Sequence, residues 1–242
     1  MAEWDAPAIV LACRAFSETD TIVTVLTELH GTHRGLARGG ASRGQASLWQ
    51  PGNLVQARWV ARLSDQLGSI RAELVHPGAA LSMDDPLALA VLSSACAVAE
   101  GAMPEREPHP KVFAGLVQLI AGLSRPEQAL PDLVRWEATL LRDLGYGLDL
   151  GSCAITGATS GLAWVSPRTG RAVCDEAAGE WTARLLRLPG FLVGGNSAEP
   201  ADWRDGLKLT GHFLERDAFG HGSQPVPPAR HMLYDRVQSL AA

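Results

Sequence analysis

The fold is decided by the stretch PGNLVQARWVARL, residues 51–63. Its first two residues, Pro51 and Gly52, are typical of a type II turn, because proline presets φ at the second position and glycine accepts a positive φ at the third. From residue 55 onward, every second side chain is apolar and the positions between them are mostly polar or charged. This period of two residues is typical of a β-strand with one buried face. The first face carries Val55, Ala57, Trp59, Ala61 and Leu63, and the second carries Gln56, Arg58, Val60 and Arg62. The stretch therefore predicts a strand that presents two arginines away from a core.

The rest of the first eighty residues also predicts short strands. β-Branched residues, which suit a pleated surface, dominate residues 20–27. A tight turn at His30-Gly31 then returns the chain through residues 32–38. Further strands are predicted at residues 8–13 and 69–75. Five short strands in about eighty residues indicate a small barrel or sandwich.

After Gly78 the apolar period changes from 2 to 3.6 residues, so we expect helices. Asp85 before Pro86 predicts a capped helix start. The predicted helices are residues 86–100, 111–123, 131–144, 180–188, 203–219 and 228–240. A strand, a turn and a second strand interrupt them between residues 150 and 178. The sequence thus predicts a mixed α+β chain, with a barrel at residues 1–79 and a mainly helical domain at residues 80–242.

The composition is that of an ordinary globular protein. The chain has 242 residues, of which 46% are apolar and 19% charged, enough to bury a core. Four cysteines are too few for a disulfide scaffold, so a reducing compartment is expected. Residues 1–7 lack the basic start of a signal peptide, and the most apolar run, residues 86–99, is shorter than the roughly 20 residues that span a bilayer. We therefore expect a cytoplasmic protein without a membrane segment.

Charge is distributed unevenly along the chain. The net charge of −5 on its own disfavours a protein that coats itself with nucleic acid. Between Glu28 and Asp65, however, there are five arginines and no acidic residue, so this window carries +5 and the remainder −10. The five are Arg34, Arg38, Arg43, Arg58 and Arg62. Small barrels hold single-stranded nucleic acid with guanidinium groups on phosphates and aromatic rings on bases, and Trp49 is the candidate ring.

Chance and coding bias also produce charge patterns of this kind. An acid-free window of this length arises by chance in a chain with this acidic content, and the excess of arginine over lysine, 19 to 2, also follows from a GC-rich coding sequence. One alternative function is a protein-interaction adaptor without direct DNA binding. Another is an enzyme with its site in the cleft between barrel and helices, although no convergent nucleophile, acid and base are visible in the sequence.

Cys153 and Cys174 flank the predicted hairpin, and each resembles one half of a zinc-ribbon pair. Three residues further on, the second half of each pair is replaced by Thr156 and Ala177. A closed tetrahedral zinc site needs four nitrogen or sulfur ligands, whereas two thiols remain here. We therefore expect two buried free thiols, with no zinc and no other cofactor.

Several blocks of the sequence, in the order in which they occur, resemble the bacterial recombination mediator family RecO. They are residues 4–28, 33–43, 50–53, 58–63 and 166–170, together with Arg135-Trp136-Glu137, Leu144-Gly145-Tyr146 and Leu148-Asp149. Their order and spacing cover nearly the whole chain. The resemblance implies an N-terminal five-stranded OB-fold barrel and a C-terminal helical domain, with a degenerate zinc-ribbon-like hairpin at about residues 150–178.

The same resemblance implies a non-catalytic function in DNA repair and homologous recombination. Family members bind single- and double-stranded DNA, anneal complementary strands and, with RecR and often RecF, load RecA onto DNA coated by single-strand-binding protein. They also bind the acidic, phenylalanine-ended tail of that protein on the helical domain. Arg135 and Arg142 are the candidate partners for its carboxylates, since arginine pairs carboxylates bidentately. Zinc-binding members use Cys-x-x-Cys pairs, from which this chain departs at Thr156 and Ala177.

Overall fold

The computed structural model describes residues 2–63, 66–195, 199–220 and 224–241. By its internal contacts the chain divides into two compact units, Met1–Ser124 and Arg125–Ala242. The first unit contains a barrel and also the helices up to residue 122, which the sequence alone placed in the second domain.

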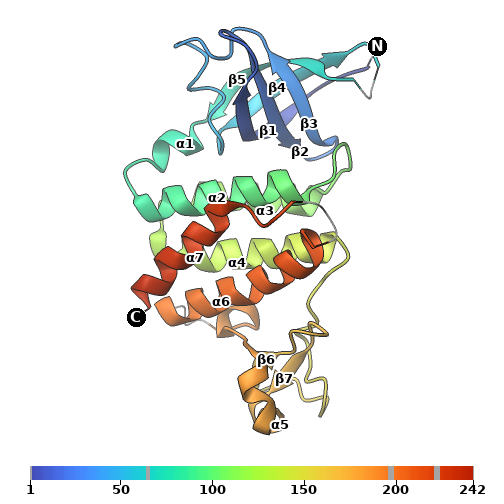
Figure 1. Cartoon of the computed structure of the whole chain (residues 1–242), viewed down its shortest axis with the longest axis vertical. Coiled ribbons are helices and arrows are strands. Elements are labelled where there is room, and N and C mark those ends of the chain that lie inside the picture. Colours follow the sequence, from blue (N-terminus) through green and yellow to red (C-terminus); the bar gives the residue numbers. More distant parts are fainter. Residues whose placement is uncertain (1, 64–65, 196–198, 221–223, 242) are drawn as a thin grey trace. The chain divides into compact units, whose positions relative to one another are not determined.

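Five strands of the first unit close into a barrel (Figure 1). They are β1 (Ala2–Ala15), β2 (Thr21–Thr27), β3 (Gly31–Ala37), β4 (Leu54–Ala61) and β5 (Gly68–His76). Their order around the barrel is β1-β2-β3-β5-β4, with antiparallel neighbours everywhere except at β3 and β5. There the described strands run parallel and pair at Gly35 with Gly68 and at Leu36 with Ser69. The predicted five-stranded OB-fold barrel is thus confirmed.

Two predicted glycine turns are confirmed and explain how the strands connect. Gly31, the first residue of β3, has φ +68°, and a Cβ on it would overlap the backbone of Glu107. Gly52 before β4 has φ +93° and lies against Leu92. Both positions require a residue without a side chain, because the backbone is left-handed and the neighbouring atoms leave no space.

The barrel interior is apolar and aromatic. Val55, Ala57, Trp59 and Ala61 point inward as their alternation predicts, whereas Leu63 lies beyond the end of β4 and is exposed.

Aromatic rings stack at one end of this interior. The rings of His30 and Trp59 both stack on Trp4, with ring centroids 5.2 and 6.1 Å from it. His33 lies edge-on to Trp4 and Trp59. Burial, followed by the nearby Arg106 guanidinium and by His30, lowers the pKa of His33 to about 4. His33 is therefore a neutral member of this cluster at pH 7.

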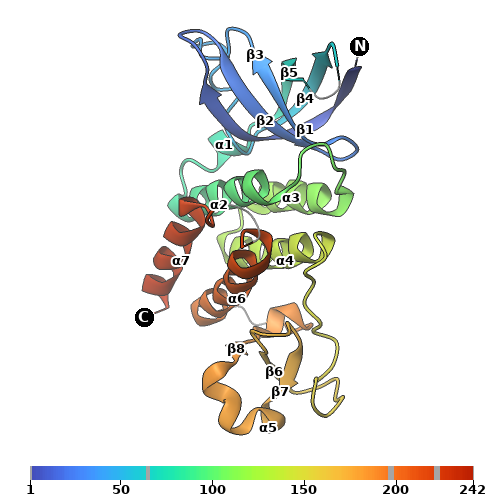
Figure 2. The same ribbon diagram turned by 45° about the vertical axis from the view of Figure 1, so that its right-hand side comes forward.

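Helices cover one side of the barrel. They are α1 (Gly78–Leu81), α2 (Pro86–Ala102) and α3 (Pro110–Gly122), and α2 and α3 lie beneath the barrel in Figures 1 and 2. The carboxylate of Asp85 accepts hydrogen bonds from the amides of Leu87 and Ala88, as expected of a helix cap. α2 packs against β1 and α3 against β2. Ile9 and Leu26, which alternate out of the barrel interior, are therefore fully buried.

The second unit combines a helical cluster with a small sheet (Figure 2). Its main helices are α4 (Pro126–Asp143), α6 (Pro200–Phe213) and α7 (Pro228–Leu240). α6 packs against both α4 and α7. A buried ion pair joins Arg230 of α7 to Glu137 of α4, with Nε and Oε1 2.6 Å apart, and Thr210 of α6 donates to the same carboxylate. A buried charge pair needs such additional hydrogen bonds, because both groups have lost their water.

The small sheet has the order β7-β6-β8. Its strands are β6 (Leu162–Val165), β7 (Ala172–Cys174) and β8 (Leu186–Arg187). The β6–β7 hairpin confirms the strand, turn and strand predicted between residues 150 and 178. After β7 the chain forms α5 (Asp175–Ala178) and a 3₁₀ segment, Gly179–Arg184. A second 3₁₀ segment, Gly190–Leu192, follows β8.

Three predicted helices differ from the structure. α4 begins at Pro126, so Pro131 lies inside the helix and does not open it. Of the helix predicted at residues 180–188, the first part forms as the 3₁₀ segment Gly179–Arg184, whereas Leu186–Arg187 is β8 and pairs with β6. The one predicted at residues 203–219 begins earlier, at Pro200, ends at Phe213 and continues as a π-helical segment, Leu214–Ala218.

Candidate nucleic-acid interface

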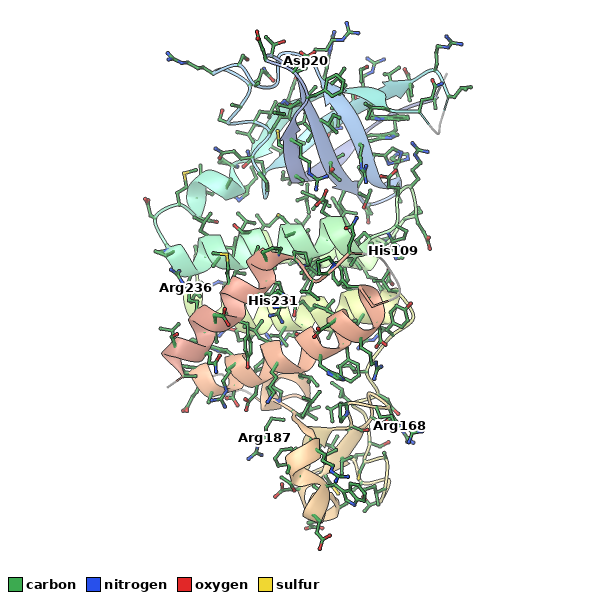
Figure 3. The ribbon with its side chains drawn as sticks, in the orientation of Figure 1. Asp20, His109, Arg168, Arg187, His231 and Arg236 are labelled. Carbon is green, nitrogen blue, oxygen red and sulfur yellow. The ribbon has the colours of Figure 1, made fainter. Side chains whose placement is uncertain are left out.

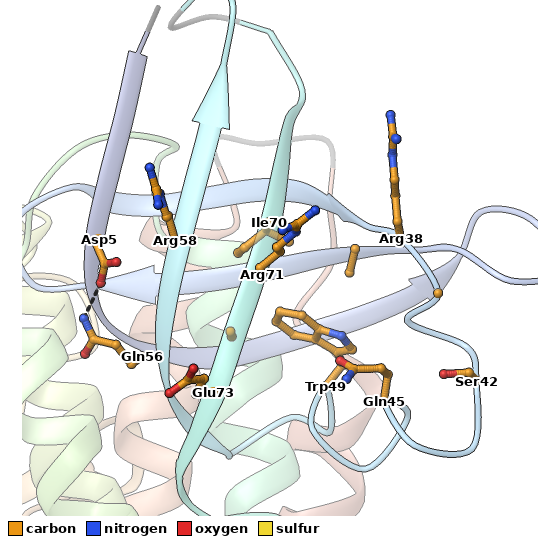
Figure 4. Close-up of a pocket in the computed structure, with 13 residues that line it drawn as sticks. Asp5, Arg38, Ser42, Gln45, Trp49, Gln56, Arg58, Ile70, Arg71 and Glu73 are labelled. Atoms are coloured by element: carbon orange, nitrogen blue, oxygen red, sulfur yellow. Dashed lines mark hydrogen bonds between the residues drawn. The ribbon is translucent and has the colours of Figure 1, made fainter.

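The open side of the barrel carries a groove of about 660 Å³. It lies over the outer faces of β4 and β5 and against the loop that joins β3 to β4 (Figure 4). Arg38 directly after β3, Arg58 on β4 and Arg71 on β5 line it, and their guanidinium groups point to the same side. Asp5 and Glu73 also line the groove, so these five charged side chains sum to +1. Three convergent cations over a shallow cavity favour a ligand with several negative charges.

Arg58 and Arg71 face each other directly across β4 and β5. Like charges in this cross-strand position destabilise a sheet unless something neutralises them. Asp5 is the β1 neighbour of Arg58, but its carboxylate accepts a hydrogen bond from the Gln56 side chain at 2.5 Å. Arg58 reaches Glu3 at 3.5 Å, and within the described chain neither Arg38 nor Arg71 forms an ion pair. Two of the three arginines of the groove are therefore without an ion-pair partner among the described residues.

The predicted arginines occupy different surroundings. Arg38 and Arg58 line the groove. Arg34 is exposed on β3 and pairs with Glu105, with Nε and Oε1 2.9 Å apart. Arg43 is exposed in the loop between β3 and β4, and Arg62 is exposed just after β4. The structure thus brings two of the five predicted arginines together with Arg71.

Sequence reasoning missed Arg71, because the acid-free window ends at Asp65. Glu73 follows two residues later, so counting charges along the chain gives this strand no basic character. The signal that finds Arg71 is the register of β4 on β5, which places it opposite Arg58. That register depends on contacts between strands, so it is a tertiary feature.

The candidate base-stacking ring, Trp49, is 2% exposed and belongs to the barrel core. Its side chain lies at the floor of the groove (Figure 4), and stacking on a base would require it to leave that core. The loop that contains Trp49 is anchored by Asn53, whose side-chain amide donates to the carbonyls of Ser47 and Leu48. The ring therefore supports the groove from below.

An exposed aromatic ring lies on the β1–β2 turn instead. Phe16 is 60% exposed. The turn is hydrogen-bonded to the start of the β3–β4 loop, through the Gly39 amide to Asp20 at 2.8 Å and the Ala41 amide to Thr19 at 2.9 Å. Phe16 thus belongs to the loop cluster next to Arg38. Its position after an apolar strand and before a polar turn was the available sequence signal.

In the second unit, Arg135 and Arg142 both lie on α4 and are exposed. Arg135 pairs with Asp132 at 2.8 Å and lies over the ring of Phe191, 5.3 Å from its centroid. Arg142, in the last turn of the helix, also interacts favourably with the helix dipole. For a carboxylate ligand, Arg135 is thus already in contact with Asp132 and Phe191, whereas Arg142 faces solvent.

The two hairpin cysteines are buried side by side with a threonine. The Cys153 sulfur accepts hydrogen bonds from the amides of Cys174 at 3.3 Å and Thr156 at 3.5 Å. The Thr156 hydroxyl is 3.5 Å from the Cys174 sulfur. Ala177 packs against the same cluster. Among the described residues no group of three or more His, Cys, Asp or Glu side chains is placed to hold a metal ion, and the absence of zinc stays a prediction.

In the part of the chain that the structure describes, no helix combines the length and apolarity needed to cross a membrane.

The closed five-stranded barrel with loops clustered at a charged groove defines the OB-fold class, in which oligonucleotides and oligosaccharides are common ligands.

Comparison with known proteins identifies the family. The family models "Recombination protein O N terminal" and "Recombination protein O C terminal" match residues 1–77 and 83–222. Curated relatives named "DNA repair protein RecO" include those of Granulibacter bethesdensis, 58% identical over 98% of this chain and 96% of the relative, and of Acidiphilium cryptum, 60% identical over 97% and 95%. The relative from Gluconacetobacter diazotrophicus is 57% identical over 98% and 96%. The chain belongs to the RecO family, and its role lies in DNA repair and recombination.

Proposed function

We propose that this protein is a non-catalytic recombination mediator that binds single- and double-stranded DNA along the groove lined by Arg38, Arg58 and Arg71. It anneals complementary strands and, together with RecR, helps to load RecA onto DNA coated by single-strand-binding protein. RecF is a further partner in this proposal, and the protein acts on chromosomal DNA in the bacterial cytoplasm without zinc. The observation that supports DNA binding most directly is the convergence of three arginines on the groove, two of which form no ion pair among the described residues.

The chemistry of the groove favours phosphate contacts over base contacts. Guanidinium groups bind phosphates irrespective of sequence, and each neutralised phosphate releases counterions. A strand held by its backbone keeps its Watson–Crick edges free to pair with a second strand, which annealing requires. The acidic remainder of the chain, with a net charge of −10, limits DNA contact to the basic part.

The test is the salt dependence of DNA binding by the full chain. We expect the double variant Arg38→Gln/Arg71→Gln to bind a labelled oligothymidine more weakly. Across a NaCl series, the slope of log K against log salt concentration should fall by about 1.4, or about 0.7 for each lost phosphate contact. Fluorescence anisotropy measures both quantities.

Arg168→Gln/Arg236→Gln is the matched control. It makes the same charge change at two exposed arginines of the second unit, which are labelled in Figure 3. This control should leave the slope unchanged. An unchanged slope in the groove variant, or an equal fall in the control, contradicts the proposed groove, and a wild-type protein that binds no DNA contradicts DNA binding altogether.

We also propose that Arg135 and Arg142 bind the carboxylates of the single-strand-binding protein tail. The support is their shared face on α4, seven residues and thus two helical turns apart. Arg135→Ala/Arg142→Ala should weaken binding of an acidic, phenylalanine-ended tail peptide, measured by calorimetry, and Arg168→Ala should not. Unchanged peptide affinity in the double variant contradicts this assignment.

A further inference from the structure

Two cysteines of the second unit form a close pair that the proposed DNA function does not use. Cys153 lies in the segment between α4 and β6, and Cys174 ends β7. The two side chains are 2% and 5% exposed and share a small apolar cluster with Trp164, Val173 and Ala178. The segment above them, residues 155–160, is exposed. The thiols therefore lie one layer beneath the surface.

The geometry places the Cys153 sulfur directly beside Cys174. The Cys153 sulfur is 3.3 Å from the amide nitrogen of Cys174, and an N–Cα bond is about 1.46 Å, so the sulfur is within about 4.8 Å of the Cys174 Cα. Thr156 contacts both sulfurs, one through its amide and the other through its hydroxyl. Cross-linked cysteines need closely spaced Cα atoms, and these contacts hold the two cysteines next to each other in the folded chain.

The two thiols also differ in character. The Thr156 side chain, followed by the amide of Cys174, lowers the pKa of the Cys153 thiol to about 6, while burial of the sulfur acts in the opposite direction. Cys96, in contrast, is buried in α2, and desolvation raises the pKa of its thiol to about 12. Cys13 is exposed on β1. Of the four free cysteines, Cys153 combines a lowered thiol pKa with a neighbouring thiol.

We propose that Cys153 and Cys174 are an oxidation site that closes to an intramolecular disulfide in the presence of hydrogen peroxide. The Cys153 thiolate attacks one peroxide oxygen, breaking the O–O bond, which gives a sulfenic acid and, after proton transfer, one water. The Cys174 sulfur then attacks the sulfenic sulfur, forming the S–S bond and releasing a second water. In balance, two thiols and one hydrogen peroxide give one disulfide and two waters.

The consequence is a covalent tie between the segment that precedes β6 and the end of β7. When the bond forms, the Cys174 sulfur loses its hydrogen and can only accept from the Thr156 hydroxyl beside it. Because the bond closes a loop in the unfolded chain, the oxidised second unit should resist unfolding more than the reduced one. A thiol reductant should restore the starting state.

The experiment uses the reduced full chain in a chelating buffer. It is treated with one equivalent of hydrogen peroxide, alkylated under denaturing conditions and digested for mass spectrometry. We expect the peptides of Cys153 and Cys174 to be joined, with the loss of two hydrogens, while Cys13 and Cys96 are recovered as alkylated thiols. Dithiothreitol should reverse the link. Recovery of Cys153 and Cys174 as separate alkylated thiols, or a link to another cysteine, overturns the proposal.

Variants assign the two roles. In Cys174→Ser the disulfide should be lost completely, and Cys153 should be trapped as a sulfenic acid by dimedone. In Cys153→Ser the other cysteine should not react with dimedone. Cys13→Ser is the matched control and should form the disulfide at the wild-type rate. Because the wild-type measurement needs no substitution, it decides the proposal even where a buried serine disturbs folding.

Discussion

Two sides of the same barrel differ in what covers them. On β1 and β2, residues that point out of the barrel, such as Ile9 and Leu26, are buried under α2 and α3. On β4 and β5, the outward positions carry Arg58 and Arg71 and line an open groove. OB-fold proteins commonly use strands 2 and 3 for ligands. Here α3 packs against β2, so the surface left for a ligand is the β4–β5 side with its adjoining loop.

The largest expected effect tests the covered side. Ile9 lines a small cavity of about 200 Å³ together with Val117 and Ile120 of α3. Ile9→Ala should lower the free energy of unfolding by about 2–5 kcal/mol, because methyl groups are lost from a packed interface. Leu74→Ala, on exposed β5, should stay within about 0.5 kcal/mol of wild type. Urea unfolding measures both, and equal losses would mean that the two sides are packed alike.

The next effect separates the interior from the outer surface at two adjacent residues of β3. His33 points to Trp4 and Trp59, and Arg34 points outward to Glu105. The pKa of His33 is lowered from 6.5 to about 4, so its neutral form stabilises the fold above pH 6.5, and this contribution is lost as the pH falls through about 4. Solvent screening keeps the loss below the roughly 3 kcal/mol that the same shift would give a fully buried group. His33→Phe should flatten the pH dependence of urea unfolding in this window, and an unaltered dependence contradicts the assignment.

A third effect concerns the loops beside the open side and depends on the proposed DNA binding. Phe16→Ala should weaken single-stranded DNA binding by about 1–3 kcal/mol, the usual contribution of a ring that stacks on a base. Duplex affinity should not change, since paired bases are already stacked. Leu29→Ala removes an equally exposed apolar side chain from the β2–β3 turn and serves as the control. Anisotropy titrations with both forms of DNA distinguish the two variants, and parallel losses on duplex DNA contradict stacking.

The smallest effect belongs to Arg34, whose partner Glu105 precedes α3. Both side chains are about half exposed, so Arg34→Gln should change the free energy of unfolding by less than about 1 kcal/mol. Because Glu105 already neutralises this arginine, the salt slope of DNA binding should also change less than in Arg71→Gln. A larger change in slope than that of Arg71→Gln would move the DNA path from the β4–β5 side toward β3.

Much of the barrel could be predicted because its signals are local. The alternation from Val55 to Ala61, the glycine turns and the Asp85 cap depend on neighbouring residues and all appear where the sequence places them. Helix starts were harder to predict, since Pro126 and Pro131 both suit an N-terminal turn and only packing selects the first. β8 escaped prediction because its two residues become a strand through pairing with β6.

The candidate site was predictable only in part, for the same reason. Arg38 and Arg58 stand out in an acid-free window, whereas Arg71 needs the strand register to join them. Whether Trp49 lies on the surface or in the core depends on how the β3–β4 loop folds back over the barrel, which no local pattern encodes. The position of Phe16 next to the groove likewise depends on hydrogen bonds between the β1–β2 turn and that loop, which the local sequence does not reveal.

The parallel contact of β3 with β5 makes this junction the seam of the barrel. In the described strands it is held by two residue pairs, so local opening should begin there. Arg38 directly follows β3 and Arg71 lies on β5, so the two strands of this junction each contribute an arginine to the groove. A polyanion that bound both arginines would hold β3 and β5 together. Because it would bind the closed barrel more tightly than the opened one, it should slow amide hydrogen exchange in β3 and β5. Binding of such a polyanion would therefore couple ligand affinity to the integrity of the barrel at the β3–β5 junction.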